Sequence, residues 1–377
     1  MIPTTELSRR TLLQAGLAAS LTTGASPLLA TSGQEETQKS LCILGGTGFL
    51  GPKVVEAAKA VGYKVTLFNR GKTNPGLFPE LEKLRGDRNS GDLSALEGRA
   101  FDVVVDTSGY VPGHVRSTAE ILGPRCNIYV FVSTISVYQS DGEGTRGEDW
   151  PTIPLTEEVL EKAKTIREAY ANYGGMKAYC EKAAEEVLPE RALVIRPGLI
   201  VGPGDPTDRF TYWPVRIARG GKVLAPGDPK AIQQPIDVRD LAEWIVRAAD
   251  AKTTGRYNAL GYRGRVNTEE LLHACKLALN TETEFTWVPD DFLRTQDIRP
   301  WLGLPLWIPG GGKHYSNRAA IEAGLTFRPV TDTISATEEW HRTTRGDAHT
   351  WRAGPTLERE AEVLEAWRKS QGLGEDL

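Results

Sequence analysis

The first part of the chain, up to about residue 200, alternates short apolar runs with longer helix-forming runs. Each apolar run has the length of a buried strand and is bounded by glycine or polar residues. Strands that alternate with helices predict an α/β fold with a doubly wound parallel sheet, covered by helices on both faces. The expected strands are residues 40–44, 65–68, 101–105, 128–132 and 193–195, with a shorter one before Gly86.

The pattern loosens after Pro197. Residues 241–247 have the spacing of an amphipathic helix that covers the sheet. The acidic stretch 139–154 is longer than a usual strand-to-helix connection and predicts either a lid or a surface insertion. The expected division is residues 40–200 for the sheet domain, residues 201–354 for the remaining sheet elements and a smaller lobe, and residues 355–377 for a C-terminal helix.

A glycine-rich turn follows the first strand and precedes a helical run. Gly45 allows the tight turn, Gly48 lets the backbone approach a pyrophosphate, and Gly51 lets helix and strand pack closely. The helix N-terminus adds partial positive charge. The turn therefore predicts a Rossmann-type dinucleotide site, and the alternative is a turn that binds nothing. The expected contacts in this turn are Gly45, Thr47, Gly48, Phe49, Leu50 and Gly51.

Tyr173 and Lys177 are spaced at i and i+4, so they share one helix face. On such a face an ammonium can lower the pKa of a phenol and make it a proton-transfer group near neutral pH. Together with the dinucleotide site, the pair indicates hydride chemistry on a carbon that bears a hydroxyl or carbonyl.

These features occur in the order of a known family. Residues 130–138 form a strand that ends in Ser/Thr and continues into Val-Tyr, and residues 194–197 read Val-Ile-Arg-Pro. With the glycine turn and the Tyr-x-x-x-Lys pair, they make the chain resemble an extended or atypical short-chain dehydrogenase/reductase of the NAD-dependent epimerase/dehydratase type. The resemblance covers roughly residues 40 to 330.

The resemblance implies an enzyme with three catalytic residues. Thr134 would orient the substrate, with Ser133 as a second candidate. Tyr173 would be the acid/base, and Lys177 would bind the nicotinamide ribose and tune the tyrosine. The structural alternatives are a threonine that caps the next turn and a tyrosine that packs with its hydroxyl satisfied.

Two positions depart from the family pattern. Residues 111–122 contain no asparagine where the family often has the fourth member of a catalytic tetrad; His114 lies nearby, and a surface histidine is its simpler interpretation. Ile135 and Ser136 follow Thr134 where relatives that dehydrate nucleotide sugars usually carry an acidic pair. Dehydration is therefore disfavoured.

The end of the second strand indicates which cofactor is bound. Asn69 is followed by Arg70 and Lys72, so the acidic residue that would accept the ribose hydroxyls of NAD is absent. A guanidinium suits a phosphate, and we expect NADP in preference to NAD; the alternative is a solvated basic turn. The expected cofactor contacts outside the glycine turn are Asn69, Arg70, Asp87, Thr107, Lys177 and Pro197.

Arg209 and Trp213 lie in a turn-rich, aromatic stretch that suits a sugar ring or, equally, an interface between lobes. We expect a small, carbohydrate-like substrate. The pattern leaves open whether the protein forms a homo-oligomer.

The N-terminus predicts export. Arg9 and Arg10 open a mildly apolar stretch to Ala30 that polar residues interrupt. Residues 1–30 have the pattern of a twin-arginine signal, and residues 31–39 that of a flexible leader. The expected partner is the twin-arginine export machinery and the expected location is periplasmic or extracellular; the alternative is a disordered basic tail.

Composition is that of a globular enzyme, with 377 residues, 40% of them hydrophobic and 25% charged. The net charge of −4 becomes −5 beyond residue 30, which gives no general attraction to nucleic acid. The four cysteines lack metal-site or disulfide spacing, so we predict no metal and buried thiols; they are Cys42, Cys126, Cys180 and Cys275.

Location and chemistry together favour redox-neutral work. An exported enzyme has little access to cytosolic dinucleotides, so a cofactor carried out already bound would have to be restored within each turnover. The leading hypothesis is an NAD(P)-retaining epimerase or oxidoreductase. The alternative is a nucleic-acid-binding or cofactor-sensing, non-catalytic member of the same fold.

Overall fold

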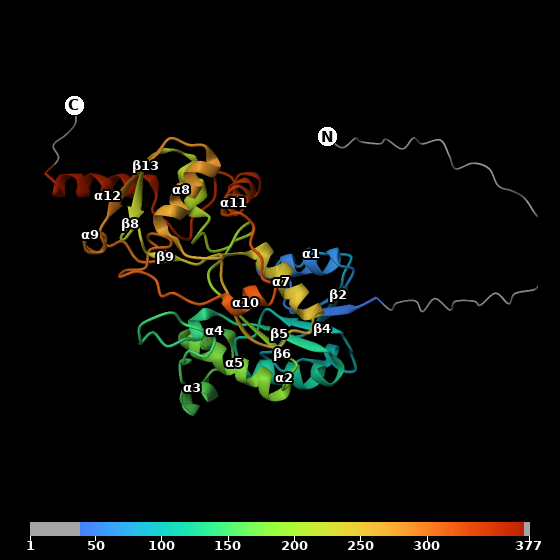
Figure 1. The fold of residues 1–377 in the computed structure, drawn as a ribbon. Helices are drawn as coiled ribbons and strands as arrows, with labels where there is room; N and C mark the ends of the chain where they lie inside the picture. The colour runs from blue at the N-terminus through green and yellow to red at the C-terminus, as the bar shows by residue number, and fades with distance from the viewer. Residues whose placement is uncertain (1–37, 373–377) are drawn as a thin grey trace, which may run out of the picture. The chain divides into compact units, whose positions relative to one another are not determined.

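The computed structural model describes residues 38–372. Its centre is a seven-stranded sheet in the order β11-β6-β5-β4-β1-β2-β3, with every neighbouring pair parallel (Figure 1). The predicted doubly wound parallel sheet is confirmed. The strands are β1 (Ser40–Leu44), β2 (Lys64–Asn69), β3 (Glu82–Arg85), β4 (Val103–Asp106), β5 (Ile128–Val132), β6 (Ala192–Pro197) and β11 (Gly255–Ala259).

Helices cover both faces of the sheet. Helices α1 (Leu50–Ala60) and α7 (Val238–Asp250) bury one apolar face, and α2 (Pro112–Leu122) and α5 (Tyr173–Val187) bury the other. All five residues of β5 are buried, because a strand in the middle of such a sheet meets a helix layer on each side. The strand order reverses between β1 and β4, which places a ligand site at the carboxyl ends of the strands.

The sheet takes its seventh strand from beyond residue 200, because β11 pairs with β6. The rest of the C-terminal part forms a lobe with its own apolar core, centred on the parallel pair of β8 and β13. The elements of the lobe are α6 (Tyr212–Ala218), β8 (Gly221–Pro226), α8 (Thr268–Leu279), β13 (Thr283–Val288), α9 (Asp290–Thr295), α11 (Val330–Thr344) and α12 (Leu357–Ser370). Short elements complete the fold: α3 (Glu157–Lys162), α4 (Ile166–Ala169), β7 (Ile200–Val201), β9 (Ile232–Gln233), β10 (Ile236–Asp237), β12 (Val266–Asn267) and α10 (Arg318–Glu322).

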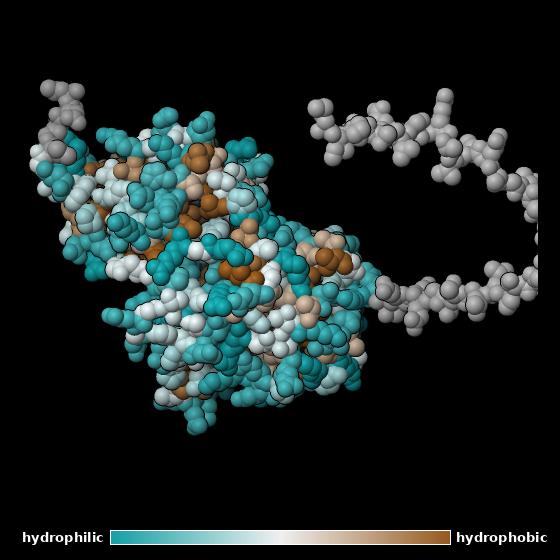
Figure 2. Space-filling view, viewed as in Figure 1, coloured by the Kyte–Doolittle hydropathy of each residue, from teal (hydrophilic) through white to brown (hydrophobic). Residues whose placement is uncertain are grey.

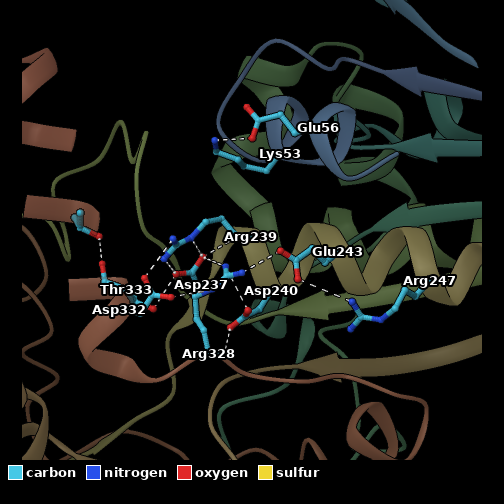
Figure 3. Close-up of polar contacts among 11 residues, drawn as sticks. Lys53, Glu56, Asp237, Arg239, Asp240, Glu243, Arg247, Arg328, Asp332 and Thr333 are labelled. Atoms are coloured by element: carbon cyan, nitrogen blue, oxygen red, sulfur yellow. Dashed lines mark hydrogen bonds and ion pairs between the residues drawn. The ribbon is translucent and has the colours of Figure 1, made fainter. Parts of the chain in front are cut away.

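A network of charges joins the start of α7 to α11 of the lobe (Figure 3). The Asp237 carboxylate is fully buried and caps α7 by accepting from the Arg239 backbone N–H. It also accepts from the Arg239 and Arg328 guanidinium groups and from the Thr333 hydroxyl. The network holds the lobe on the helix that covers the sheet.

Residues 139–154 are held in place by the C-terminal part of the chain. The Arg146 N–H donates to the His314 carbonyl at 2.9 Å, and the Ser316 N–H donates to the Arg146 carbonyl at 2.8 Å. The Arg146 guanidinium lies between the rings of Trp150 and Tyr315, 5.0 and 5.7 Å from their centroids. This pairing favours a fixed surface insertion over a lid.

The face in Figure 2 is mostly polar, and its apolar patches are small and separated by polar side chains. Within residues 38–372, no helix combines the length and the apolar character needed to cross a bilayer.

Candidate active site

A cavity of about 780 Å³ opens at the carboxyl ends of the central strands. The glycine turn, the ends of β2, β4, β5 and β6, and Trp301 of the lobe line it. Every residue predicted for the cofactor or for catalysis lines this one cavity. Of the substrate candidates, Ser133 and Arg209 also line it, and Trp213 does not.

The glycine turn has the geometry that a dinucleotide site needs. Gly45 has φ of +108°, a backbone conformation that residues other than glycine rarely adopt. A Cβ at Gly51 would lie 2.5 Å from the Gly46 Cα, so α1 can start this close to the turn only with glycine there. A Cβ at Gly48 would meet no atom within 4 Å, which leaves room for a ligand against the backbone.

Thr134, Tyr173 and Lys177 meet where β5 ends and α5 begins. Lys177 is buried and its Nζ donates to the carbonyls of Gly109 and Val132 at 2.6 and 2.7 Å. Burial lowers the pKa of Lys177 to about 8. The ammonium has three donors, so one remains for a ligand.

The phenol of Tyr173 does not have the lowered pKa that its spacing from Lys177 predicts. Burial raises the pKa of Tyr173, and a hydrogen bond from Thr134 offsets this only in part. The physical reason is that the Lys177 ammonium is directed at two backbone carbonyls. With this arrangement of partners the phenol is therefore protonated near neutral pH.

Ser133 is tied to a buried ion pair. Its hydroxyl donates to Glu181 Oε1, and the same carboxylate accepts from Arg196 through Nε at 2.9 Å and a terminal nitrogen at 2.6 Å. Glu181 lies one turn beyond Lys177 on the same face of α5. Sequence reasoning missed this pair, although the spacing of Tyr173, Lys177 and Glu181 is a signal for it.

The end of β2 is braced by Asn69, which donates to the Gly45 carbonyl at 2.8 Å and accepts from Arg85. Arg70 is exposed and lines the cavity with Lys72. Asp87 stands after β3 and accepts from the Asn89 backbone N–H.

Arg88 was not predicted as a site residue, yet it lines the cavity almost fully buried. Its guanidinium donates to both oxygens of Asp106 at 2.7 and 3.0 Å, and to the Ser108 hydroxyl. The bidentate pair with a fully buried carboxylate fixes Arg88 in the cavity wall.

His114 lines the cavity half-buried at the start of α2, so it is not the surface residue that the sequence suggests. Burial lowers the pKa of His114, and a hydrogen bond to the Lys164 backbone acts in the opposite direction. Ile166, just beyond Lys164, lines the same cavity. Nearby, the ring of Tyr170 stacks on the rings of Tyr110 and Tyr173, and the Tyr110 and Tyr173 rings are tilted relative to each other.

Trp213 corrects the prediction of a substrate contact. Its side chain is completely buried in the core of the lobe, where the indole donates to the Pro305 carbonyl at 3.1 Å. α6 turns it inward because its apolar face must be buried. The aromatic side chain that the lobe contributes to the cavity is Trp301, about ninety positions further on, which the sequence analysis did not single out.

Comparison with known proteins agrees with this geometry. The model of the NAD dependent epimerase/dehydratase family matches residues 41–259, more than half of the chain. The chain belongs to this family. It is an α/β protein of the extended short-chain dehydrogenase/reductase kind, and the family match covers the glycine turn, the Tyr-x-x-x-Lys pair and the sheet as far as β11.

Individual proteins can also be compared with this chain. The chain is 26% identical over 265 residues to the chloroplast stem-loop binding protein of 41 kDa b of Arabidopsis thaliana, and the match spans 64% of each protein. The dTDP-glucose 4,6-dehydratase of Bacillus anthracis, solved with NAD, has a TM-score of 0.59 at 17% identity, covering 83% of this chain and 98% of the other. The UDP-glucose 4-epimerase of Thermus thermophilus, also solved with NAD, has a TM-score of 0.58 at 19% identity, covering 81% and 99%. At such identities the solved structures establish the fold.

Proposed function

We propose that the protein is an NAD(P)-dependent epimerase or oxidoreductase that acts on a hydroxyl or carbonyl of a carbohydrate-like substrate. The observation that carries the proposal is the meeting of Thr134, Tyr173 and Lys177 in the cavity that the glycine turn lines. The open backbone at Gly48 and the N-terminus of α1 suit a dinucleotide. When bound, the nicotinamide would supply the exchange of a hydride.

The protein residues would supply binding and proton transfer. Thr134 would hold the reacting hydroxyl of the substrate, and Tyr173 would exchange a proton with that oxygen. The remaining donor of Lys177 would bind the nicotinamide ribose and stabilise the phenolate while it is deprotonated. The Glu181–Arg196 pair would hold Ser133, and with it the end of β5, in position.

The cofactor preference is part of the proposal. Arg70 and Lys72 at the end of β2 support NADP, since a 2′-phosphate placed there would meet two cations. The solved neighbours above carry NAD, so NAD is the alternative. Comparison of NADP and NAD binding between the wild type and Arg70→Ala discriminates between the two cofactors.

We further propose that the enzyme is exported by the twin-arginine route and retains its cofactor. Arg9 and Arg10, on which the export proposal rests, lie outside the described residues. A retained cofactor must be restored in each cycle, so hydride would leave the substrate and return to it, as in an epimerisation.

The test is turnover by the purified holoenzyme without added cofactor. Candidate carbohydrates are incubated with the protein while product and nicotinamide absorbance are followed. We expect multiple turnovers with no net change in absorbance, and a loss of roughly 10²-fold or more in Tyr173→Phe with cofactor still bound. A single turnover that resumes only when NADP or NADPH is added would leave a conventional oxidoreductase.

A second candidate function is binding of structured RNA. It is favoured by the name of the chloroplast relative, a stem-loop binding protein. The net charge of −4 and the preserved catalytic set disfavour it. A salt-dependent shift of stem-loop RNA at physiological ionic strength, unaffected by Tyr173→Phe, would establish this second function.

A further inference from the structure

The cations that line the cavity are unevenly distributed. Within the described part of the chain they are Arg70, Lys72, Arg88, Lys177 and Arg209. Arg70 and Lys72 follow β2, at the end of the cavity where the adenosine ribose of a dinucleotide would lie. Arg88 is held by Asp106, and Lys177 by two backbone carbonyls. Arg209 therefore remains as the cation available to a substrate.

Arg209 is close to the reacting group. It lies between β7 and α6, and its Nε donates to the Thr207 hydroxyl at 3.2 Å. Burial raises the pKa of Tyr173, and the charge of Arg209 is one of the influences that act against this rise. Arg209 and Tyr173 line the same cavity, so one substrate could contact both the guanidinium and the phenol.

The backbone around this cation is unusual. Asp208 and Trp301 have φ of +62° and +65°, in the left-handed region that residues other than glycine rarely adopt. The Arg209 guanidinium lies 6.0 Å from the centre of the Trp301 ring. Strained backbone of this kind persists where the surrounding structure enforces it, often at ligand sites. Trp301 and Arg209 together present an aromatic face and a fork of donors to the cavity.

The part of the cavity between Arg209 and Trp301 is called the Arg209 subsite below. Asp205 limits how much negative charge this subsite can accept. Its side chain is almost completely buried, and its Oδ1 accepts from the Thr207 N–H and hydroxyl at 2.8 and 2.7 Å. Burial raises the pKa of Asp205, and the charge of Arg209 acts against this rise, so the carboxylate in turn offsets part of the positive charge of Arg209. The subsite therefore suits one negative charge rather than the two or so of a nucleotide diphosphate, whose desolvation would be uncompensated.

We propose that the substrate is a sugar acid, an aldonic or uronic acid, whose single carboxylate is bound by Arg209 while its reacting hydroxyl lies at Tyr173. The planar guanidinium matches a carboxylate with two parallel hydrogen bonds. The Trp301 ring offers a surface for the apolar face of the sugar. This inference rests on the proposed function and names its substrate class. It disfavours the nucleotide sugars that the solved neighbours carry or act upon.

The test measures binding directly, so that it does not depend on turnover. The purified full-length protein, with its cofactor bound, is titrated with glucuronate and gluconate, with glucose, with glucose 6-phosphate, and with UDP-glucuronate, and binding is followed by tryptophan fluorescence and calorimetry. We expect the sugar acids to bind at least tenfold more tightly than glucose. Tighter binding of UDP-glucuronate or of the sugar phosphate would overturn the proposal.

Variants at Arg209 make the test specific. Arg209→Gln should weaken sugar-acid binding at least tenfold and leave glucose binding unchanged, and Arg209→Lys should restore part of the loss. Arg219→Gln is the matched control, because Arg219 is 40% exposed at the end of α6 and does not line the cavity. Equal weakening of acid and neutral sugar in Arg209→Gln, with unchanged cofactor content and circular dichroism, would show that Arg209 does not read the carboxylate.

The two proposals fail in different ways. If sugar acids bind through Arg209 but no product forms, the substrate class stands and the proposed enzymatic function fails. If another substrate is turned over and sugar acids do not bind, the enzymatic function stands and this inference fails.

Discussion

The proposed preference for NADP rests on one exposed side chain, that of Arg70. It lines the cavity at the end of β2, where Asn69 is occupied in bracing the turn. We expect Arg70→Ala to weaken binding of the 2′-phosphorylated cofactor by about 1 to 3 kcal/mol more than binding of NAD, because a charge-assisted contact is lost. Calorimetric titration of apoprotein with both cofactors measures the difference. Lys64→Ala, at the opposite end of β2, is the control; equal losses for both cofactors in Arg70→Ala would contradict the assignment.

Lys177 should make cofactor binding depend on pH. Burial lowers its pKa to about 8, so the ammonium is present below that pH and is lost as pH rises through it. Only the ammonium keeps its third donor for the ribose, so affinity should fall above pH 8, approaching about tenfold per pH unit. Cofactor-binding curves measured between pH 6.5 and 9.5 test this. The Lys177→Met variant should bind the cofactor weakly, with an affinity that does not change over the same range. A wild-type affinity that does not change across pH 8 would rule out this role.

At the scale of elements, the start of α7 should be a stability determinant. Burial alone would raise the pKa of Asp237, but hydrogen bonds from Arg239 and Thr333 hold it below its usual value. The Asp237 carboxylate therefore contributes to the free energy of unfolding above the unfolded-state pKa of about 4, and this contribution is lost as the pH falls below that value.

Asp237→Asn tests this role, since it would leave two arginines of the network in Figure 3 without their buried partner. We expect it to lower the free energy of unfolding by about 3 to 5 kcal/mol at pH 7, and by less below pH 4. Denaturant unfolding at both pH values measures the difference. Asp332→Asn is the matched control, because Asp332 is half exposed and contacts the same arginines at 3.6 and 3.7 Å. If Asp332→Asn lowered the free energy of unfolding by as much as Asp237→Asn, burial of the Asp237 carboxylate would not be the cause of the loss.

At the scale of the whole molecule, the export proposal depends on two residues outside the described part of the chain. If the protein is exported as proposed, replacing both Arg9 and Arg10 with Lys should leave the full-length precursor in the cytosol, because the arginine pair would be the recognised signal. Fractionation of cells that produce the wild type and the double variant, with detection of the protein in each fraction, measures the effect. Unchanged export of the double variant would contradict the proposed export route. The argument for a retained cofactor, which depends on that route, would fail with it.

The sequence by itself determined most of the central sheet and the cofactor and catalytic residues that line the cavity. Glycine spacing, strand length and the i, i+4 pair are local properties, because they depend on backbone conformation and on neighbours within a few residues. For this reason β1, β5 and the turn between β1 and α1 lie where their patterns predict them. In the same way Thr134, Tyr173 and Lys177 can each be recognised from neighbouring residues, and the fold then brings the three side chains together.

Only the tertiary structure decided which side chains are free to act. Trp213 and Trp301 are both aromatic residues in turn-rich stretches, and packing of the lobe buries the first and places the second at the cavity. Arg88 meets Asp106, and Lys177 meets the Gly109 and Val132 carbonyls, across separations that no local pattern encodes. The charge and pKa of each group depend on these distant partners and on burial, and both arise only when the whole chain has folded.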